Sequence, residues 1–352
     1  MAKKNIYIVG FGWASIGFLK EIDINKYNIN IISKSGKFNY TPLLAQNIKN
    51  NNKITFDIHN IINSNNVNLI EDEVNTIDFE RNLVVANNVT ANFDYLIFSH
   101  GSCINTFDIS GVEENCNFIK MDDDSKKIKQ RLLELPHNSK IIVVGCGLTG
   151  SEIIGTLIDY KKFTICALDA LPRPLQSFDK NISMMAVNLW KRNGVELYLN
   201  NIVSKINKNS IQFKNVKEDL GFDMVIWCAG IKISPLSEKI NKTLQLDCNK
   251  GIPVNKYLQI KNKPGVFAIG DCAYSGSPPT AQVAYQQGTY LAKQFNNNFD
   301  NKSKFEFNNK GQICYIGNRK SVFQNNYFKT GGTLTYYLNT FFHAYQLFIL
   351  RK

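Results

Sequence analysis

Closely spaced cysteine pairs and long apolar runs are both missing from this chain of 352 residues. Its eight cysteines are scattered, and none forms a CxxC or similar pair. This spacing argues against a zinc site, a disulfide framework and a dithiol redox centre, so we expect no bound metal. No apolar run reaches the ~18–20 residues of a membrane-spanning helix. We therefore expect a protein that is soluble or lies on a membrane.

Acidic residues are outnumbered by basic ones, with 29 Asp and Glu against 41 Lys and Arg and a formal net charge of +12. Such a charge suits an anionic partner, for example a nucleotide or an acidic membrane surface. No RNA- or DNA-binding motif is present, so we expect no nucleic-acid partner. The length allows two or three domains. No secretory signal or other presequence is visible, because the opening residues lead directly into an apolar strand.

The strongest motif follows the β-branched run Ile141–Val144. Its three glycines have GxGxxG spacing, a helix is predicted after them, and the next predicted strand ends at Asp169. In a βαβ dinucleotide site, the glycines permit a tight turn and close approach of a pyrophosphate, and the acid binds ribose hydroxyls. Asp169 favours NAD over NADP, although the nearby Arg173 could serve an additional phosphate. The glycines are Gly145, Gly147 and Gly150.

A less complete copy of this motif opens the chain. A predicted strand runs into Gly10 and Gly12, and a helix and a second strand follow. Ser15 takes the third glycine position, and Ser33 stands where an acidic residue is usual. The alternative is an ordinary strand–helix turn that contains two glycines.

The stretch 266–288 connects these motifs. A predicted strand, 266–269, ends at Gly270 and Asp271, and a helix is expected over 281–295 after two prolines. An acidic strand end can bind ribityl or ribose hydroxyls, and a helix N-terminus at Ala281 stabilises negative charge. Two βαβ motifs with a late strand returning to the first describe a protein that binds FAD and NAD. Two unrelated Rossmann-like units are the alternative.

We therefore expect an α/β fold with two Rossmann-like domains, the second inserted in the first, and a short C-terminal amphipathic segment. The expected FAD-binding domain comprises 1–125 and 253–310, the NADH-binding domain 126–252, and the membrane-associating segment 311–352. Residues 68–91 alternate and turn, which predicts a small antiparallel sheet. Buried strands are also predicted to end at Gly101 and Gly230, and the second of these could meet the nucleotide.

The order of these motifs resembles the pyridine nucleotide-disulfide oxidoreductase superfamily, and more closely its type II, non-electrogenic NADH:quinone oxidoreductases. The segment PPTAQVAYQQ, 278–287, discriminates between them, because generic disulfide reductases lack it and carry a cysteine pair that is absent here. The matching stretches cover nearly the whole chain in order. They are 10–20, 37–44, 104–115, 141–152, 168–180, 265–272 and 278–296.

The resemblance implies roles for individual residues. Thr41 and Pro42 would lie against the flavin, and Asp271 would bind its ribityl chain. Glu152 would lie near the nicotinamide. The adenosine diphosphate of FAD would be held by Gly10, Gly12 and Ser33. NADH would be held by Gly145, Gly147, Gly150 and Asp169. Further cofactor-binding candidates at strand and helix ends are Gly101, Gly230, Gly270 and Ala281.

Gln282 and Gln286 would lie on the other side of the flavin, where quinone enters. Four residues apart on one predicted helix, their amides share a face and could bond a quinone carbonyl or the flavin pyrimidine edge. Ordinary polar surface positions are the alternative.

The function implied by the resemblance is that of a flavoprotein NADH dehydrogenase of electron transport, peripheral to a membrane. NADH would pass hydride to FAD, and two electrons would go on to a quinone without proton pumping. The eukaryotic members of the family work at the mitochondrial inner membrane. One alternative keeps the enzyme but makes a protein carrier or oxygen the acceptor. Another is a degenerate nucleotide-binding protein without activity, which departures such as Ser15, His100, Leu148 and Thr156 would permit.

The C-terminal stretch 334–349 has apolar residues at i, i+3, i+4 and i+7 spacing, with polar residues such as Asn339 and His343 between them. A helix with this pattern is amphipathic and would lie in a membrane interface rather than span it. Packing on its own domain, or on a partner subunit in a homodimer, is the alternative.

Overall fold

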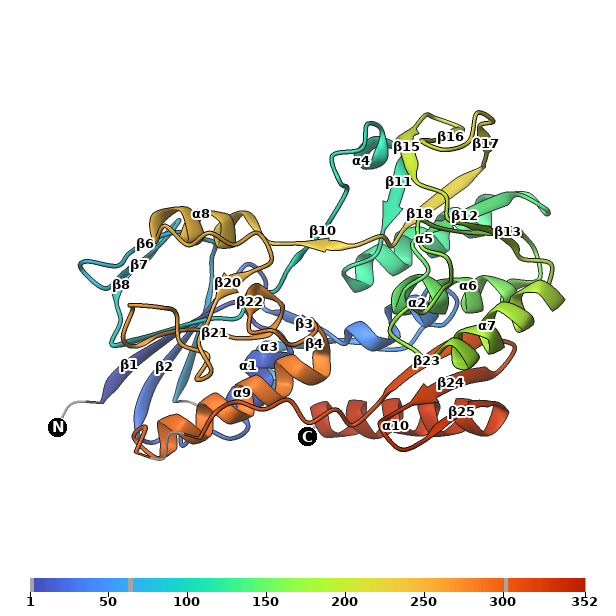
Figure 1. Ribbon diagram of the computed structural model, residues 1–352. Coiled ribbons are helices and arrows are strands. Elements are labelled where there is room, and N and C mark those ends of the chain that lie inside the picture. The colour runs from blue at the N-terminus through green and yellow to red at the C-terminus, as the bar shows by residue number, and fades with distance from the viewer. Residues whose placement is uncertain (1–2, 63–65, 301–302, 352) are drawn as a thin grey trace. The chain divides into compact units, whose positions relative to one another are not determined.

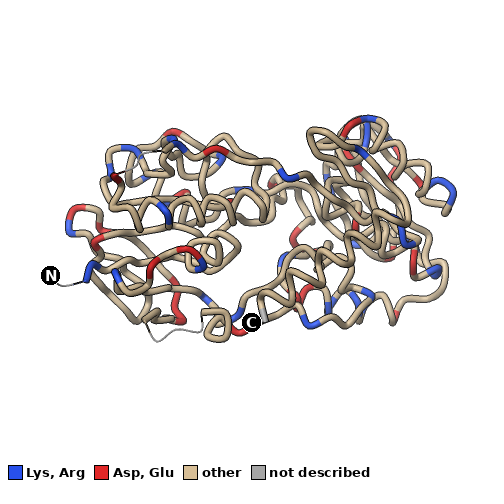
Figure 2. Tube along the Cα trace, turned by 90° about the horizontal axis from the view of Figure 1, so that it is seen from below, with Lys and Arg blue, Asp and Glu red and all other residues tan. Residues whose placement is uncertain are grey.

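The computed structural model describes residues 3–62, 66–300 and 303–351. The chain divides into two compact units, each built from three segments. Unit 1 comprises Met1–Phe38, Phe56–Cys103 and Ile231–Asn308, and unit 2 comprises Asn39–Thr55, Ile104–Gly230 and Asn309–Lys352. Each unit contains one of the two glycine motifs. Lys and Arg are interspersed with Asp and Glu along each unit (Figure 2).

Unit 1 is built on a five-stranded parallel sheet of order β21-β9-β1-β2-β5. Helices α1 and α9 pack on one face, and α8 with the antiparallel strands β6, β7 and β8 covers the other (Figure 1). The sheet strands are β1 (Lys4–Val9), β2 (Tyr27–Ser33), β5 (Val67–Glu71), β9 (Tyr95–Phe98) and β21 (Val266–Ala268). The covering elements are α1 (Trp13–Leu19), α8 (Pro235–Thr243), α9 (Ala281–Asn296), β6 (Val74–Asp78), β7 (Leu83–Ala86) and β8 (Thr90–Asn92).

Helices α1 and α9 approach so closely that glycine is required at their contact. A Cβ atom on Gly17 would lie 2.2 Å from the carbonyl oxygen of Tyr285, and one on Gly288 would lie 2.0 Å from that of Ala14. No side chain fits at these distances without moving backbone. The contact therefore fixes the first half of α9 beside the first turn of α1.

The expectation of an antiparallel sheet over 68–91 is wrong for its first residues. Strand β5 pairs in parallel with β2, with Ser33 opposite Glu71, and only β6, β7 and β8 are antiparallel. An edge strand of a parallel sheet is partly exposed, so its sequence alternates like that of an antiparallel strand. The local pattern alone could not separate the two.

Unit 2 contains the second five-stranded parallel sheet, of order β11-β18-β12-β13-β14. The antiparallel strands β15, β16 and β17 pack on one face and α6 on the other (Figure 1). The sheet strands are β11 (Cys116–Phe118), β12 (Lys140–Val144), β13 (Thr164–Asp169), β14 (Glu196–Leu199) and β18 (Met224–Trp227). The other elements are α5 (Asp122–Glu134), α6 (Leu148–Tyr160), α7 (Lys180–Arg192), β15 (Val203–Ile206), β16 (Ser210–Phe213) and β17 (Leu220–Gly221).

Short elements complete the chain. They are β3 (Lys37–Asn39), η1 (Thr41–Leu43), α2 (Leu44–Asn47), β4 (Thr55–Asp57), α3 (Ile58–Ile62), β10 (Cys103–Ile104), α4 (Val112–Asn115), β19 (Ile231–Lys232), β20 (Ile252–Pro253), η2 (Gly270–Cys272) and β22 (Ala273–Tyr274).

The C-terminal part of unit 2 is an antiparallel sheet followed by the long helix α10 (Thr333–Arg351). The sheet comprises β23 (Gln312–Gly317), β24 (Lys320–Gln324) and β25 (Lys329–Gly332). Strand β23 packs on α6, where a Cβ atom on Gly155 would lie 2.6 Å from the Gly317 nitrogen. The sequence predicted the helix but not this sheet. The α/β fold with two Rossmann-like sheets and a C-terminal helix is confirmed.

Helix α10 buries polar residues and exposes apolar ones. Thr335, Asn339 and His343 are 3%, 1% and 6% exposed, and Asn339 donates to the Ser321 hydroxyl of β24 at 3.4 Å. None of the helices in the described ranges is long and apolar enough to cross a membrane. The exposed apolar side chains of α10 are Leu334, Tyr337, Leu338, Phe341, Phe342, Tyr345 and Phe348.

Candidate functional site

In unit 1 the glycine loop leaves an open approach to the start of α1. Gly10 has φ +95°, its N–H donates to Ile32 at 2.8 Å, and a Cβ there would lie 2.4 Å from the His100 Cα atom. Gly12 is the N-cap of α1, and a Cβ there would meet no protein atom within 4 Å. Gly10 therefore sets the turn, and Gly12 leaves space in which a pyrophosphate can approach the backbone.

Ser15, which stands in the third glycine position, is hydrogen-bonded to the backbone of this loop. Its side chain is fully buried, its hydroxyl donates to the Gly10 carbonyl at 3.0 Å, and it lies 2.7 Å from the Ser99 hydroxyl. A serine in place of this glycine is compatible with the loop, because its hydroxyl forms a hydrogen bond with the Gly10 carbonyl.

The end of β2 lacks the usual acidic residue, and the neighbouring strand provides a carboxylate. Ser33 donates its hydroxyl to the Ser35 carbonyl at 2.9 Å. Glu71, opposite Ser33 at the end of β5, accepts from the Gly36 N–H at 2.9 Å. Sequence reasoning missed Glu71 because it assigned this stretch to the antiparallel sheet.

The turn that carries Asp271 lies beside the first turn of α1. A Cβ on Gly270, which has φ +74°, would lie 3.2 Å from the Ala14 Cβ and 3.5 Å from the Ala284 Cβ. Asp271 accepts from the Ser102 hydroxyl at 3.5 Å. The turn that carries Asp271 is thus held between Ala14 of α1 and Ala284 of α9.

The glutamines of α9 differ in their surroundings. Gln286 donates to the Asn308 carbonyl at 2.9 Å and accepts from its N–H at 3.0 Å, so its amide holds a neighbouring segment. Gln282 is half-buried one turn earlier. Gln287, which sequence reasoning did not select, is 1% exposed, accepts from the Gly270 N–H at 2.7 Å and donates to Ser275 at 2.9 Å. Gln287 therefore fixes the Asp271 turn.

We expect Gln287→Leu to lower both stability and flavin content. The substitution leaves the partly buried Gly270 N–H without this acceptor, a loss of about 1 kcal/mol, the lower end of the range for a buried donor. Thermal unfolding and the flavin absorbance per chain measure the two effects. Gln286→Leu is the matched control, since its amide is less buried, and it should shift the unfolding temperature far less. Equal shifts in the two variants would contradict this role of Gln287.

The glycine loop of unit 2 is built in the same way. Gly145 has φ +90°, and its N–H donates to the Leu168 carbonyl at 2.8 Å. A Cβ on Gly150 would lie 1.8 Å from the Gly145 carbonyl oxygen, whereas one on Gly147 would meet nothing within 4 Å. Gly150 thus permits α6 to start close to the loop, and Gly147 leaves the approach open.

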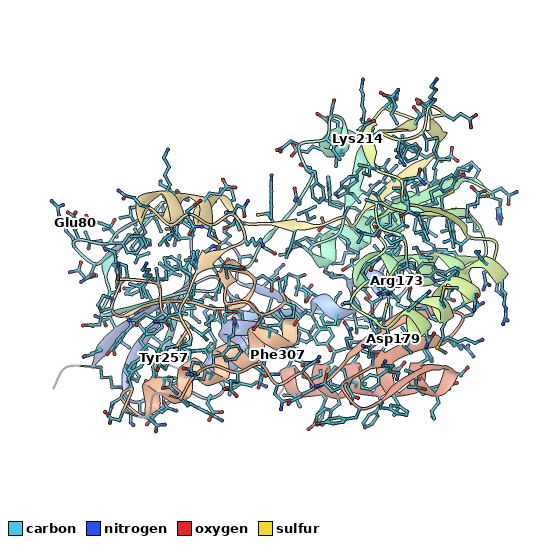
Figure 3. The ribbon with its side chains drawn as sticks, in the orientation of Figure 1. Glu80, Arg173, Asp179, Lys214, Tyr257 and Phe307 are labelled. Carbon is cyan, nitrogen blue, oxygen red and sulfur yellow. The ribbon has the colours of Figure 1, made fainter. Side chains whose placement is uncertain are left out.

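Asp169 at the end of β13 is fixed to this loop. Its carboxylate accepts from the Cys146 N–H at 2.6 Å and from the Leu171 N–H at 2.9 Å. Arg173 donates to two carbonyls of its own loop, those of Leu175 and Gln176, both at 3.1 Å, and lies with Asp179 in the segment before α7 (Figure 3). Both oxygens of the Asp169 carboxylate are thus held by backbone N–H groups at the glycine loop, and the Arg173 guanidinium stabilises its own loop.

A buried cluster of titratable groups follows the glycine loop along α6. Glu152 keeps some exposed surface, but protein surrounds its carboxyl group, and this desolvation raises its pKa to about 8. The Tyr315 N–H of β23 lies 3.5 Å from the Glu152 carboxylate. Because this pKa lies above 7, Glu152 carries a proton at neutral pH. Burial is the main cause of the raised pKa of Tyr40, and the ionised form of Glu152 adds to it.

Tyr40 connects this cluster to α10. Its hydroxyl lies 2.9 Å from Nδ1 of His343, and the two side chains are 1% and 6% exposed. Burial lowers the pKa of His343 to about 4, so the ring is neutral. Tyr40 directly precedes Thr41 and Pro42, which begin η1. Sequence reasoning missed this pair because its members are far apart in the chain.

The predicted site residues divide between the two units. The predicted site residues in unit 1 are Gly10, Gly12, Ser33, Gly101, Gly270, Asp271, Ala281, Gln282 and Gln286. Gly230, in unit 2, ends the segment after β18 with φ +73°, and a Cβ there would lie 2.7 Å from the Phe107 ring. The predicted site residues in unit 2 are Thr41, Pro42, Gly145, Gly147, Gly150, Glu152, Asp169 and Gly230.

Comparison with known proteins identifies similar chains. A probable NADH dehydrogenase of Dictyostelium discoideum is 29% identical over 94% of this chain and 82% of its own. The external alternative NADH-ubiquinone oxidoreductase of Yarrowia lipolytica mitochondria is 25% identical over 96% of this chain and 75% of its own. The structure of NDH2 from Plasmodium falciparum in complex with NADH has a similar fold, with a TM-score of 0.91 and 24% identity over 99% of this chain and 96% of that one.

The family model of the pyridine nucleotide-disulphide oxidoreductases matches residues 4–288, a range that includes both glycine loops and the Asp271 turn. The family expected from the motifs is therefore confirmed. Since the match covers most of the chain, this protein belongs to the pyridine nucleotide-disulphide oxidoreductase family.

Proposed function

We propose that this chain is a type II NADH:quinone oxidoreductase. The observation that carries the proposal is the presence of two open glycine loops, at Gly12 and Gly147, one in each unit. Relatives that align with most of this chain are named NADH dehydrogenase and NADH-ubiquinone oxidoreductase. In the reaction, NADH gives up a hydride and a quinone takes up two electrons and two protons, one of which comes from solvent.

FAD, when bound, supplies the two-electron carrier between NADH and quinone. In unit 1, the open backbone at Gly12 would receive its pyrophosphate, and the Asp271 carboxylate its ribityl hydroxyls. In unit 2, Gly147 and Gly150 would permit the NADH pyrophosphate to approach α6, and Asp169 would accept hydrogen bonds from the adenosine ribose. These assignments fit the donors and the open space at each loop.

Glu152 would exchange protons during the reaction, and the α9 glutamines would contact the quinone. A carboxyl group that is protonated at neutral pH can give up a proton and regain it from solvent. Gln282 presents an amide one turn before Gln286, whose own amide is engaged with Asn308. We assign contact with the quinone carbonyl to this face of α9, which Gln282 and Gln286 share, and the bonds to Asn308 give Gln286 the further role of holding the neighbouring segment.

Anaerobic addition of NADH to the purified protein tests this function. The yellow absorbance of the flavin should bleach within the mixing time of a stopped-flow instrument and return on addition of a short-chain quinone. Ferredoxin and air, added separately, should restore it more slowly. If the flavin absorbance returned faster with ferredoxin or air, that compound rather than the quinone would be the acceptor. If NADH left the absorbance unchanged, the proposal would be refuted.

The surface of α10 supports peripheral attachment to a membrane, which we include in the proposal. Seven large apolar side chains of this helix are exposed, and its buried side chains are those of Thr335, Asn339, His343 and Leu350. A contiguous apolar face of this kind marks a membrane or protein contact. Several relatives are named as mitochondrial, so the inner mitochondrial membrane is the proposed location, and homodimer formation through this face is the alternative.

Vesicle flotation tests the attachment. We expect Leu338→Asp combined with Phe341→Asp to lose binding to phosphatidylcholine vesicles, since these side chains are 58% and 72% exposed and a charge opposes insertion. The matched control is Ile202→Asp combined with Val216→Asp, whose side chains are exposed elsewhere in unit 2. Unchanged flotation with a lower oligomeric mass would assign the face to a subunit contact.

A further inference from the structure

Unit 2 contains a cavity of about 490 Å³ that the proposed reaction does not use. Its lining comes from four places: the end of α2 and the residues after it, the last turns of α6 with the residue that follows, strand β23 with the turn after it, and Tyr336 of α10. Three of the lining side chains are cationic: Lys49, Lys161 and Arg319.

Within the described part of the chain, no ion pair joins these three cations to a carboxylate. The one carboxylate in the lining, Asp159, accepts from the Tyr315 hydroxyl with one oxygen and from the Asn318 N–H at 2.9 Å with the other. The cavity lining therefore has an excess of positive charge, with three cations and one carboxylate.

Several donors in the lining are available to an anion. Lys49 uses one of its three N–H groups on the Asp159 carbonyl at 2.6 Å, which leaves two. Arg319 contributes a planar guanidinium, the donor geometry that suits phosphate oxygens best. The amides of Gln46 and Asn50 also line the cavity, and Asn318 donates one amide N–H to Asn193 at 2.7 Å, which leaves its second N–H. Cations together with neutral N–H donors favour a phosphate over a carboxylate of the same size, because phosphate offers more acceptor oxygens.

We propose that this cavity binds a phosphate group, and that its source is the headgroup of an anionic phospholipid. Tyr336, whose ring lies 5.6 Å from that of Tyr315, belongs to α10 and directly precedes the exposed Tyr337 and Leu338. A phosphate site formed in part by a residue next to the apolar face can take a lipid whose chains follow that face. The choice of lipid as the source rests on the proposed membrane attachment, whereas the phosphate site itself does not.

The experiment uses the full-length flavoprotein and a variant with Lys49→Gln, Lys161→Gln and Arg319→Gln. The matched control removes three exposed lysines from the β15–β16 region of the same unit: Lys205→Gln, Lys208→Gln and Lys214→Gln. Flotation is measured with vesicles of phosphatidylcholine alone and with a minority of phosphatidic acid. Unfolding temperatures are measured in inorganic phosphate and in chloride of equal ionic strength.

We expect phosphatidic acid to increase the vesicle affinity of the wild type and of the control variant. In the cavity variant this increase should be smaller by at least about tenfold, because each basic side chain at a membrane surface raises affinity roughly fivefold. Stabilisation by phosphate without a gain from phosphatidic acid would support the site and assign it to a soluble phosphate compound. Equal losses in the two triple variants, or no response of the wild type to either anion, would overturn the proposal. These readouts do not depend on NADH oxidation, so failure of the proposed enzymatic function is detected separately.

Discussion

Gly150→Ala is expected to raise the KM for NADH by about ten- to hundredfold while the flavin stays bound. The new Cβ atom would lie 1.8 Å from the Gly145 carbonyl oxygen, and both are backbone-anchored, so the loop itself must move. Overpacking of this kind costs about 1–3 kcal/mol, and about 1.4 kcal/mol corresponds to a tenfold change in affinity. Steady-state NADH oxidation and flavin absorbance per chain provide the measurement.

Gly147→Ala is the informative companion of this variant. A Cβ there meets no protein atom within 4 Å, so the unfolding temperature should match that of the wild type. The same Cβ would occupy the space assigned to the pyrophosphate, and NADH binding should weaken all the same. Wild-type affinity in Gly147→Ala would show that the dinucleotide does not approach the backbone at this position.

The second large effect concerns the pH dependence of stability. Glu152 has a pKa of about 8 in the folded chain against 4.5 as its ordinary value, so the folded state holds its proton over a range in which the unfolded chain has lost it. The stability that this group contributes is therefore complete below pH 4.5 and is lost as pH rises toward 8. Each pKa unit corresponds to about 1.4 kcal/mol. Glu152→Gln should remove this loss.

Chemical unfolding of wild type and Glu152→Gln between pH 5 and pH 9 measures the effect as a difference between the two proteins. The difference is needed because burial also lowers the pKa of His100 and His343 to about 4. The contribution of these two histidines to the free energy of unfolding therefore rises with pH up to 6.5. Glu134→Gln, which removes an exposed carboxylate, should follow the wild type. Parallel curves for wild type and Glu152→Gln would mean that this carboxyl group is hydrated in the folded chain.

The parts of the fold that were predictable from the sequence are those with a local signal. The glycine spacing at Gly145 and Gly150 and the β-branched run before them identify a strand, a turn and a helix within one short segment. The conformations found at Gly10 and Gly145 follow from the same requirement, because both take positive φ where a side chain would strike backbone. The position of helix α9 after two prolines was likewise predictable from the local sequence.

The features that escaped prediction depend on distant contacts. Nothing near Tyr40 indicates that its hydroxyl meets His343, and the QQ dipeptide does not show that Gln287, rather than Gln286, fixes the Asp271 turn. The polar stripe of α10 reads as the solvent side of an amphipathic helix, yet Asn339 and His343 are buried. Each case needs a contact between segments whose proximity is set by the fold as a whole.

The division of unit 2 into three separated segments has a consequence for biosynthesis. Strand β23 lies against Gly155 of α6, and it belongs to the last segment, which begins at Asn309. During translation, the α6 surface that β23 covers stays without its partner until almost all of the chain has left the ribosome. A stalled or prematurely ended product would expose that surface, and chaperones that bind apolar segments would have a long period in which to engage it.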